Sequence, residues 1–196
     1  MAFHRRLAAD QTGVTIVEFA FIAPIFLLLL IGIFDIGHMI YIRSVLQGAM
    51  QNAGRDSTLE SGSSMRSAID EYVTSQVRAV IPNAQLEFER RNYQNFTNVG
   101  KPEDIVDAND NGQYDEGECF YDANNNNVWD SDIGRDGMGG ANDVVLFTAT
   151  VVYDRAFPLW RLIDVGQEAR ISASTVLRNQ PFSVQAQRSV RLVCPT

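Results

Sequence analysis

The chain has 196 residues, of which 45% are hydrophobic, and it carries a formal net charge of −8 at pH 7. This acidic balance disfavours nucleic acid as a partner. The two histidines, His4 and His38, lie near the start of the chain and beside a long apolar run, where neither could join a Ser or Cys triad in a soluble pocket. The sequence therefore predicts no enzyme, no small-molecule substrate and no zinc site.

The first thirteen residues form a short basic leader. It contains His4, Arg5 and Arg6 and one acidic residue, Asp10. Because the more basic flank of a membrane segment stays in the cytoplasm, we expect this end to be cytoplasmic and the rest of the chain to be exported. A leader and one membrane helix leave about 150 residues, which is enough for one soluble core.

An apolar run follows the leader. Residues 14–33 are twenty residues that contain almost no polar side chains. As a helix they span about 30 Å, the thickness of a hydrocarbon core, so we expect a transmembrane helix over residues 14–36. Glu18 lies inside this run, and an acid in lipid costs several kcal/mol unless it finds a partner. Asp35 lies near the other end, where solvation at the interface would be enough to explain it.

Glu18 also belongs to a motif, in which Gly13 is followed by Val14-Thr15-Ile16-Val17 and then by Glu18 and Phe19. This pattern resembles the processing site of type IV prepilins and pseudopilins. The resemblance implies cleavage after Gly13 by a prepilin peptidase and pairing of Glu18 with the new α-ammonium group of an adjacent subunit. A plain signal anchor is the alternative, whereas a secretory signal peptide would be shorter and would end in small residues.

Helical periodicity continues beyond the membrane run to about Arg55, with apolar residues three and four apart. Residues 57–64 are a small, polar break. A second helix is predicted from Ser63 or Ser64 to about Val80, where Pro82 follows. The first helix is therefore one long rod, transmembrane in its first half and amphipathic in its second.

Alternating patterns predict strands over residues 84–89, 169–178 and 183–193, the last two as a hairpin, and a run of β-branched and aromatic residues predicts a strand over residues 144–153. We expect a loop over residues 90–101 that is anchored by Phe96, and an apolar loop or short helix over residues 157–163. The predicted fold class is α+β. The long N-terminal helix packs on a small antiparallel sheet, and residues 37–196 form the exported domain.

Residues 103–143 form an acidic insertion with twelve acids and one base, a net charge of −11. Such a segment repels itself unless cations neutralise it. Residues 107–118 match the twelve-residue calcium loop D-x-[DN]-x-[DN]-G-x5-E, in which Gly112 permits the sharp turn. Calcium takes six to eight hard oxygen ligands. The expected ligands are the side chains of Asp107, Asn109, Asn111, Asp115 and Glu118 and the backbone carbonyl of Gln113.

The pattern recurs fifteen residues later with two departures. Asn127 replaces the turn glycine, although Asn tolerates a positive φ. The twelfth position is Ile133, so Asp132 or another acid must complete the shell. The expected ligands of this second loop are Asp122, Asn124, Asn126, Asp130 and Asp132, with Val128 in the place of Gln113.

Only three residues, Cys119 to Tyr121, separate the two loops, so the helices that flank an EF-hand do not fit between them. The loops are more similar to the helix-poor calcium repeats of extracellular modules. An acidic, solvated linker without a fixed ion is the alternative, but disorder does not need Asp or Asn at every second position. We expect structural Ca²⁺, for which an affinity of about 10⁻⁴–10⁻³ M suffices outside the cell.

The two cysteines, Cys119 and Cys194, both lie in the exported part, where the environment permits a disulfide. The bridge would tie the acidic insertion to the C-terminus. It would contribute about 4 kcal/mol in the chain-entropy model. Two free structural thiols are the alternative.

The whole chain is similar to the TadE-type pseudopilins of the tight-adherence (Flp) type IV pilus system. The residues that carry the resemblance are Gly13 to Ala20, the end of the Leu-rich run at residues 32–37, and Val176 to Phe182. The resemblance implies a pilin-like fold and a minor pseudopilin or assembly factor in the inner membrane, with a prepilin peptidase and other Tad/Flp pilins as partners. It implies roles in pilus biogenesis, adhesion or secretion, and a place in the pilus or at the cell surface after processing. A signal-anchored periplasmic calcium-binding protein without a pilus role is the alternative.

Overall fold

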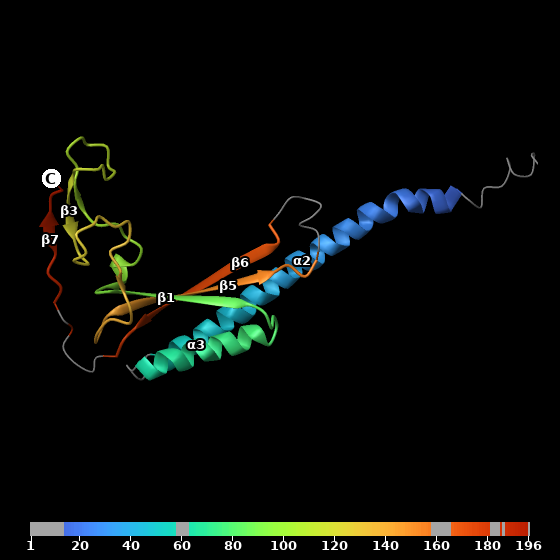
Figure 1. The fold of residues 1–196 in the computed structure, drawn as a ribbon, viewed down its shortest axis with the longest axis horizontal. Coiled ribbons are helices and arrows are strands. Elements are labelled where there is room, and N and C mark those ends of the chain that lie inside the picture. The colour runs from blue at the N-terminus through green and yellow to red at the C-terminus, as the bar shows by residue number, and fades with distance from the viewer. Residues whose placement is uncertain (1–13, 58–62, 158–165, 181–184, 186, 196) are drawn as a thin grey trace, which may run out of the picture.

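The computed structural model describes residues 14–57, 63–157, 166–180, 185 and 187–195. Figure 1 shows three parts along the long axis: a half-helix that projects at one end, a middle domain of helices and sheet, and a small sheet with long loops at the other end. We call this last part the distal module and define it as residues 101–134 and 189–195. The α+β class is confirmed. The leader, including Gly13, lies outside the described residues.

Helix α2, Val14–Ser57, is continuous for 44 residues and contains Pro24. Its first half is largely exposed. In its second half Ile42, Leu46, Met50 and Ala53 recur at three- and four-residue spacing and are at most 1% exposed. The structure therefore joins the predicted apolar and amphipathic segments into one rod, of which only the second half packs on the domain (Figure 1).

Helix α3, Ser63–Arg78, packs against α2 and adds Ile69, Val73 and Val77 to the same core. Its end is tied to the next strand, because Arg78 Nε donates a hydrogen bond to the carbonyl of Ala84 at 3.2 Å. The second predicted helix is thus confirmed, and it ends two residues earlier than expected.

The main sheet has the strand order β4-β1-β5-β6, and all neighbouring strands are antiparallel. Alternate residues of β5 face the helices, so Phe147, Ala149 and Val151 are buried there at 1% exposure or less. Helix α2 packs across β6 and β5, which confirms the predicted helix on an antiparallel sheet. The strands are β1 (Gln85–Tyr93), β4 (Arg135–Asp136), β5 (Val144–Asp154) and β6 (Glu168–Arg178).

Strand β1 is longer than predicted. The expected loop began at Arg90, but residues 90–93 continue the strand and pair with β5. The guanidinium carbon of Arg90 lies 4.1 Å from the centre of the Phe147 ring, and its side chain forms an ion pair with Asp70 of α3. The expected anchor Phe96 is 55% exposed in a 3-10 turn (η1, Phe96–Asn98), whereas Tyr93 is buried. The loop prediction was wrong for residues 90–93, because Arg90 occupies a core-facing position as a hydrophobic residue would.

The second sheet lies in the distal module and has the antiparallel order β2-β3-β7, formed by β2 (Ile105–Val106), β3 (Cys119–Asp122) and β7 (Arg191–Val193). The predicted C-terminal hairpin is wrong. Strand β6 pairs with β5 along its whole length, whereas β7 pairs with β3. Of the described part of the predicted strand, only residues 191–193 are a strand, and residues 181–184 and 186 lie outside the description.

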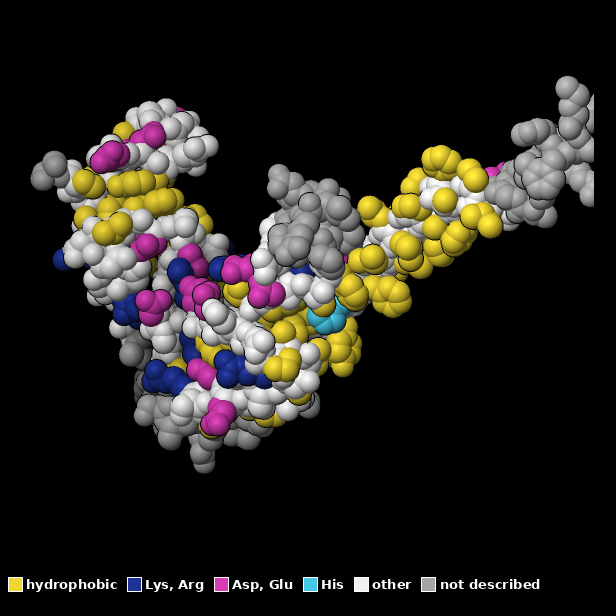
Figure 2. All heavy atoms as spheres, turned by 45° about the vertical axis from the view of Figure 1, so that its right-hand side comes forward, with side chains coloured by type: hydrophobic (Ala, Val, Ile, Leu, Met, Phe, Trp, Pro, Cys, Tyr) yellow, Lys and Arg dark blue, Asp and Glu magenta, His cyan; other side chains and the backbone are white. Residues whose placement is uncertain are grey.

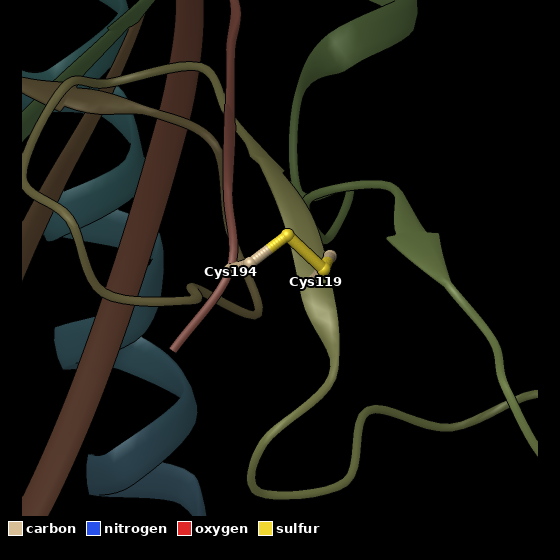
Figure 3. The surroundings of a disulfide bond; sticks show 2 residues. All are labelled: Cys119 and Cys194. Atoms are coloured by element: carbon tan, nitrogen blue, oxygen red, sulfur yellow. A yellow bond between two sulfur atoms is a disulfide. The ribbon is translucent and has the colours of Figure 1, made fainter. Parts of the chain in front are cut away.

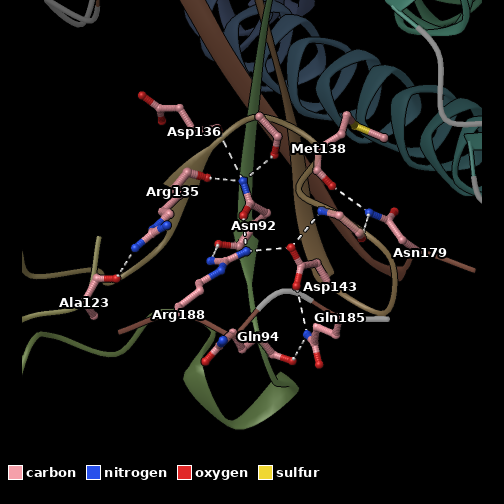
Figure 4. Close-up of polar contacts among 12 residues, drawn as sticks. Asn92, Gln94, Ala123, Arg135, Asp136, Met138, Asp143, Asn179, Gln185 and Arg188 are labelled. Carbon is pink, nitrogen blue, oxygen red and sulfur yellow. Dashed lines mark hydrogen bonds and ion pairs between the residues drawn. The ribbon is translucent and has the colours of Figure 1, made fainter. Parts of the chain in front are cut away.

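A buried polar network explains where the C-terminal segment goes (Figure 4). Arg188 donates hydrogen bonds to the side-chain oxygen of Asn92 and to the carboxylate of Asp143, both at 2.6 Å. Gln185 donates to the same carboxylate at 2.8 Å. Burial opposes ionisation of Asp143, but these donors and the N–H of Gly140 outweigh it and lower the pKa of Asp143. The chain is therefore held across the end of the main sheet and reaches β3 rather than β6.

Candidate functional site

The first candidate site is the apolar half of α2. The helix is long and apolar enough to cross a membrane. Figure 2 shows this half as a rod covered by hydrophobic side chains that stands clear of the folded domain. Glu18 and Phe19 lie on its exposed surface, Phe19 being 68% exposed. Val14 is the first residue of the helix. The structure thus places the three described processing candidates on the free half of the helix, and Gly13 lies outside the described residues.

The first calcium-loop candidate, residues 107–118, is held together by side-chain oxygens. Asp107 accepts the backbone N–H groups of Asn109, Asn111 and Gly112 at 3.3, 3.2 and 2.7 Å. These bonds, the one from Gly112 first, lower the pKa of Asp107. Asp115 accepts the side-chain amides of Asn109 and Asn111 at 2.7 and 2.6 Å. Gly112 has a φ of 75°, as the turn position requires.

The second loop repeats this network almost bond for bond. Asp122 accepts the N–H groups of Asn126 and Asn127 at 3.2 and 2.9 Å. Asp130 accepts the side-chain amides of Asn124 and Asn126, both at 2.6 Å. Asn127 has a φ of 65°, which confirms that it takes the conformation of the turn glycine. The two loops therefore share one local structure as well as one sequence pattern.

A glutamate closes each loop by accepting two backbone N–H groups. Glu118 accepts the N–H groups of Ala108 and Asp115, the second and ninth residues of the first loop, at 2.9 and 3.1 Å. Glu103 accepts the N–H groups of Ala123 and Asp130, the second and ninth residues of the second loop, at 2.7 and 3.2 Å. Glu103 therefore stands where the twelfth residue of the second loop would stand, although it precedes both loops in the sequence.

Glu103 was not among the predicted ligands, but the sequence contains a signal for it. It precedes Glu118 by fifteen residues, which is the interval between Asp107 and Asp122. The repeat thus begins at each glutamate, four residues before the first Asp of a loop. The twelve-residue pattern begins at that Asp, so it does not include an acid that precedes it.

Asp132, the acid expected to complete the second loop, has other partners. Its carboxylate accepts the hydroxyl of Tyr93 at 2.8 Å and the N–H of Gly134 at 3.0 Å. It lines the same hollow as Asn124, Asn126 and Asp130, so it lies beside the loop. The hydrogen bond to Asp132 and burial of the ring, with burial the larger cause, raise the pKa of Tyr93.

An approximate two-fold axis relates the two loops. Ile105 of β2 pairs with Phe120 of β3, and the ring of Tyr114 stacks on that of Trp129, with centres 4.8 Å apart and planes at 7°. In both pairs the partners are fifteen residues apart in the sequence. Equivalent residues of the two repeats therefore face each other, as a two-fold axis between them requires.

Two carboxylates that hold the second loop, those of Glu103 and Asp122, are buried. Glu103 is 3% exposed and Asp122 is fully buried. Burial raises the pKa of Glu103, the N–H donors of Ala123 and Asp130 act against this, and the charge of Asp122 raises it further. Among the described residues, no three carboxylate, His or Cys side chains gather as a ready metal cluster. N–H and amide donors satisfy the loop oxygens.

Cys119 and Cys194 form a disulfide (Figure 3). The bridge joins the start of β3 to the residue after β7, so of the two alternatives the disulfide is confirmed. Cys119 directly follows Glu118, the last residue of the first loop. The C-terminus is thus fastened between the two calcium-loop candidates.

Residues 13–55 match the model of the TadE-like protein family. Over this segment, the chain is similar to TadE-like proteins. The match covers the motif around Glu18 and almost all of α2, and it ends before α3. No curated protein and no solved structure matches the chain. This similarity of the N-terminal segment favours a protein associated with Tad (Flp) pili. The distal module lies outside the matched residues.

Proposed function

We propose that this protein is a minor pseudopilin or assembly factor of a Tad (Flp) pilus. It is anchored once in the inner membrane, with its N-terminus in the cytoplasm and its folded domain in the periplasm. The observation that carries the proposal is the TadE-like match over residues 13–55, because these residues include the motif and the whole free half of α2. The basic leader supports the orientation.

Processing is the first step of the proposed function. A prepilin peptidase cleaves after Gly13 and leaves Val14 as the new N-terminus. Glu18, exposed on an apolar helix, is then an acid in lipid that needs a partner. The α-ammonium group of a neighbouring pilin supplies it and sets the register of the two helices. The other Tad/Flp pilins are therefore the partners, and the assembled pilus serves adhesion or secretion.

Calcium binding by the distal module is the second part of the proposal. The repeated network supports it, because it gathers the Asn side chains at alternate positions of both loops around the carboxylates of Asp115 and Asp130. The side-chain oxygens of Asn109 and Asn111 each accept one loop N–H group and keep a second lone pair that could serve an ion. Asn124 and Asn126 do the same in the second loop. The ion would then replace the amide donors. Glu118 and Glu103 complete the two shells, and binding stabilises the folded module.

N-terminal sequencing of the protein purified from membranes tests the processing step. A mature chain that begins at Val14 supports a pseudopilin, whereas an intact leader supports a plain signal anchor with a calcium-binding domain. Glu18→Ala should insert into the membrane and be cleaved, yet fail to co-purify with other pilins. Normal incorporation of this variant would contradict the pairing of Glu18.

Chelation tests the calcium part separately. Removal of calcium should lower the melting temperature of the full-length protein in detergent. Asp107→Ala combined with Glu118→Ala should abolish most of this effect, while Glu71→Ala, an exposed acid of α3, should leave it unchanged. Equal melting with and without the ion would rule out a structural calcium role.

A further inference from the structure

The two loops share the segments that support them. Three residues separate Glu103 from Asp107, and three separate Glu118 from Asp122. Each of these segments therefore begins with the closing glutamate of one loop and ends with the first aspartate of the other. The segments contain β2 and β3, which pair with each other across the two-fold axis. Fixing either loop therefore also fixes one end of a segment that leads into the other loop.

We infer that the two loops bind calcium as one positively cooperative unit. This inference rests on the calcium binding proposed above and adds how its two sites regulate each other. An ion in the second loop that takes the carboxylate of Glu103 fixes the start of the segment that leads to Asp107. An ion in the first loop that takes Glu118 fixes the segment that leads to Asp122.

Backbone contacts transmit this coupling. The N–H of Glu103 donates to the carbonyl of Asp130 at 2.9 Å, so the segment of β2 is held by the end of the second loop. The N–H of Glu118 donates to the carbonyl of Asp115 at 3.0 Å, which holds the segment of β3 to the end of the first loop. The N–H of Tyr121 then joins β3 to the carbonyl of Asp104 at 2.8 Å.

Aromatic contacts join the loops on the other side. The indole N–H of Trp129 donates to the carbonyl of Glu103 at 3.1 Å, and its ring stacks on Tyr114 of the first loop. Tyr114 also meets Phe120 of β3 edge-on, with ring centres 5.8 Å apart. A Trp129 ring that is fixed by a bound second loop therefore restricts the first loop as well.

Two effects decide the sign of the coupling. An ion in either loop restricts the motion of both segments, so the second ion binds with a smaller loss of chain and side-chain entropy. Repulsion between two divalent ions opposes this. The shells together hold more negative charge than the two ions bring, so that repulsion is compensated and ordering prevails. The six carboxylates are those of Glu103, Asp107, Asp115, Glu118, Asp122 and Asp130.

Calorimetric titration of the calcium-free, disulfide-bonded full chain in detergent micelles tests the inference. We expect two ions per chain and a Hill coefficient well above 1. In Glu103→Gln the first loop should bind roughly threefold to tenfold more weakly than the wild-type midpoint, because a coupling of about 5- to 150-fold enters the midpoint as its square root. Asp104→Asn, an exposed neighbour with the same loss of charge, should bind as wild type does.

The outcomes separate this inference from the proposal on which it rests. Two ions taken up with a Hill coefficient of 1, and an unchanged first site in Glu103→Gln, would overturn the coupling and leave calcium binding in place. A wild-type protein that takes up no calcium would overturn both. If Glu103→Gln does not fold, the Hill coefficient of the wild-type protein decides alone.

Discussion

Asp35 of α2 and Arg155, just after β5, form an ion pair in which Oδ2 and Nη1 are 2.7 Å apart. Their side chains are only 14% and 16% exposed. One residue earlier on the helix, Phe34 packs against Phe157, with ring centres 6.4 Å apart. Phe157 is the one described residue of the apolar loop predicted for residues 157–163. The folded domain is thus fastened to α2 where the free apolar half ends, and solvation alone does not account for Asp35.

Asp35→Asn should destabilise the domain, because it leaves the charge of Arg155 buried without its partner. We expect the free energy of unfolding to fall by about 3 kcal/mol. Denaturant unfolding of the full chain in detergent measures this. Arg170→Gln is the control, since its pair with Glu87 is 3.9 Å long and two-thirds exposed on both sides, and should cost less than about 0.5 kcal/mol. Equal effects of the two variants would contradict a buried, stabilising pair.

The disulfide should contribute most of the attachment of β7. This strand has three residues, of which Leu192 is 51% exposed, so it buries little apolar surface. Cys119→Ser combined with Cys194→Ser should lower the free energy of unfolding by about 4 kcal/mol in the chain-entropy model. Denaturant unfolding measures the loss, and adding a dithiol to the wild-type protein should reproduce it. Leu192→Ser, on the same strand, should cost far less. A wild-type stability that does not respond to reduction would contradict the prediction.

Much of this fold follows from local pattern. The spacing of Ile42, Leu46 and Met50 defines the buried face of α2. The β-branched and aromatic residues define β5, and alternation defines β6. The repeated Asp and Asn residues define both loops, and the positive φ of Asn127 was expected from its place in the pattern. Each of these features depends on residues that are close together in the sequence.

The features that the sequence did not reveal depend on distant partners. Arg90 continues β1 because its side chain contacts Phe147 of β5 and Asp70 of α3. The C-terminal segment leaves β6 because Arg188 is held by Asp143. Glu103 closes a loop that begins nineteen residues after it. In all three cases a charged side chain is placed by tertiary contacts, which periodicity cannot report.

Gly134→Ala should destabilise the junction between the main sheet and the distal module. A Cβ at Gly134 would lie 2.7–2.8 Å from ring atoms of Tyr93, a rigid and buried side chain. Displacing that ring should cost about 1–3 kcal/mol. The control is Gly48→Ala in α2, where a Cβ meets nothing within 4 Å and helix propensity should add up to about 1 kcal/mol. If Gly134→Ala raised the melting temperature as Gly48→Ala should, the Tyr93 ring would be free to move aside and the prediction would be wrong.

Arg188→Gln should loosen the C-terminal segment in a pH-dependent way. The pKa of Asp143 is lowered from its ordinary value of 3.8, partly by Arg188, so ionised Asp143 favours the folded state. This contribution is fully present above pH 3.8 and is lost as the pH falls through that value towards the lower folded pKa. At pH 7 the variant should therefore be less stable by about 2 kcal/mol, the range of a hydrogen bond to a charged group.

The difference between wild type and Arg188→Gln should shrink as the pH falls below 3.8, because protonated Asp143 no longer attracts the guanidinium. Urea unfolding at several pH values between 7 and 3 measures it, with Arg178→Gln, an exposed residue at the end of β6, as control. A difference that stays constant over this range would mean that Arg188 acts through packing and its bonds to Asn92. The charge of Asp143 would then not be what directs the chain from β6 to β3.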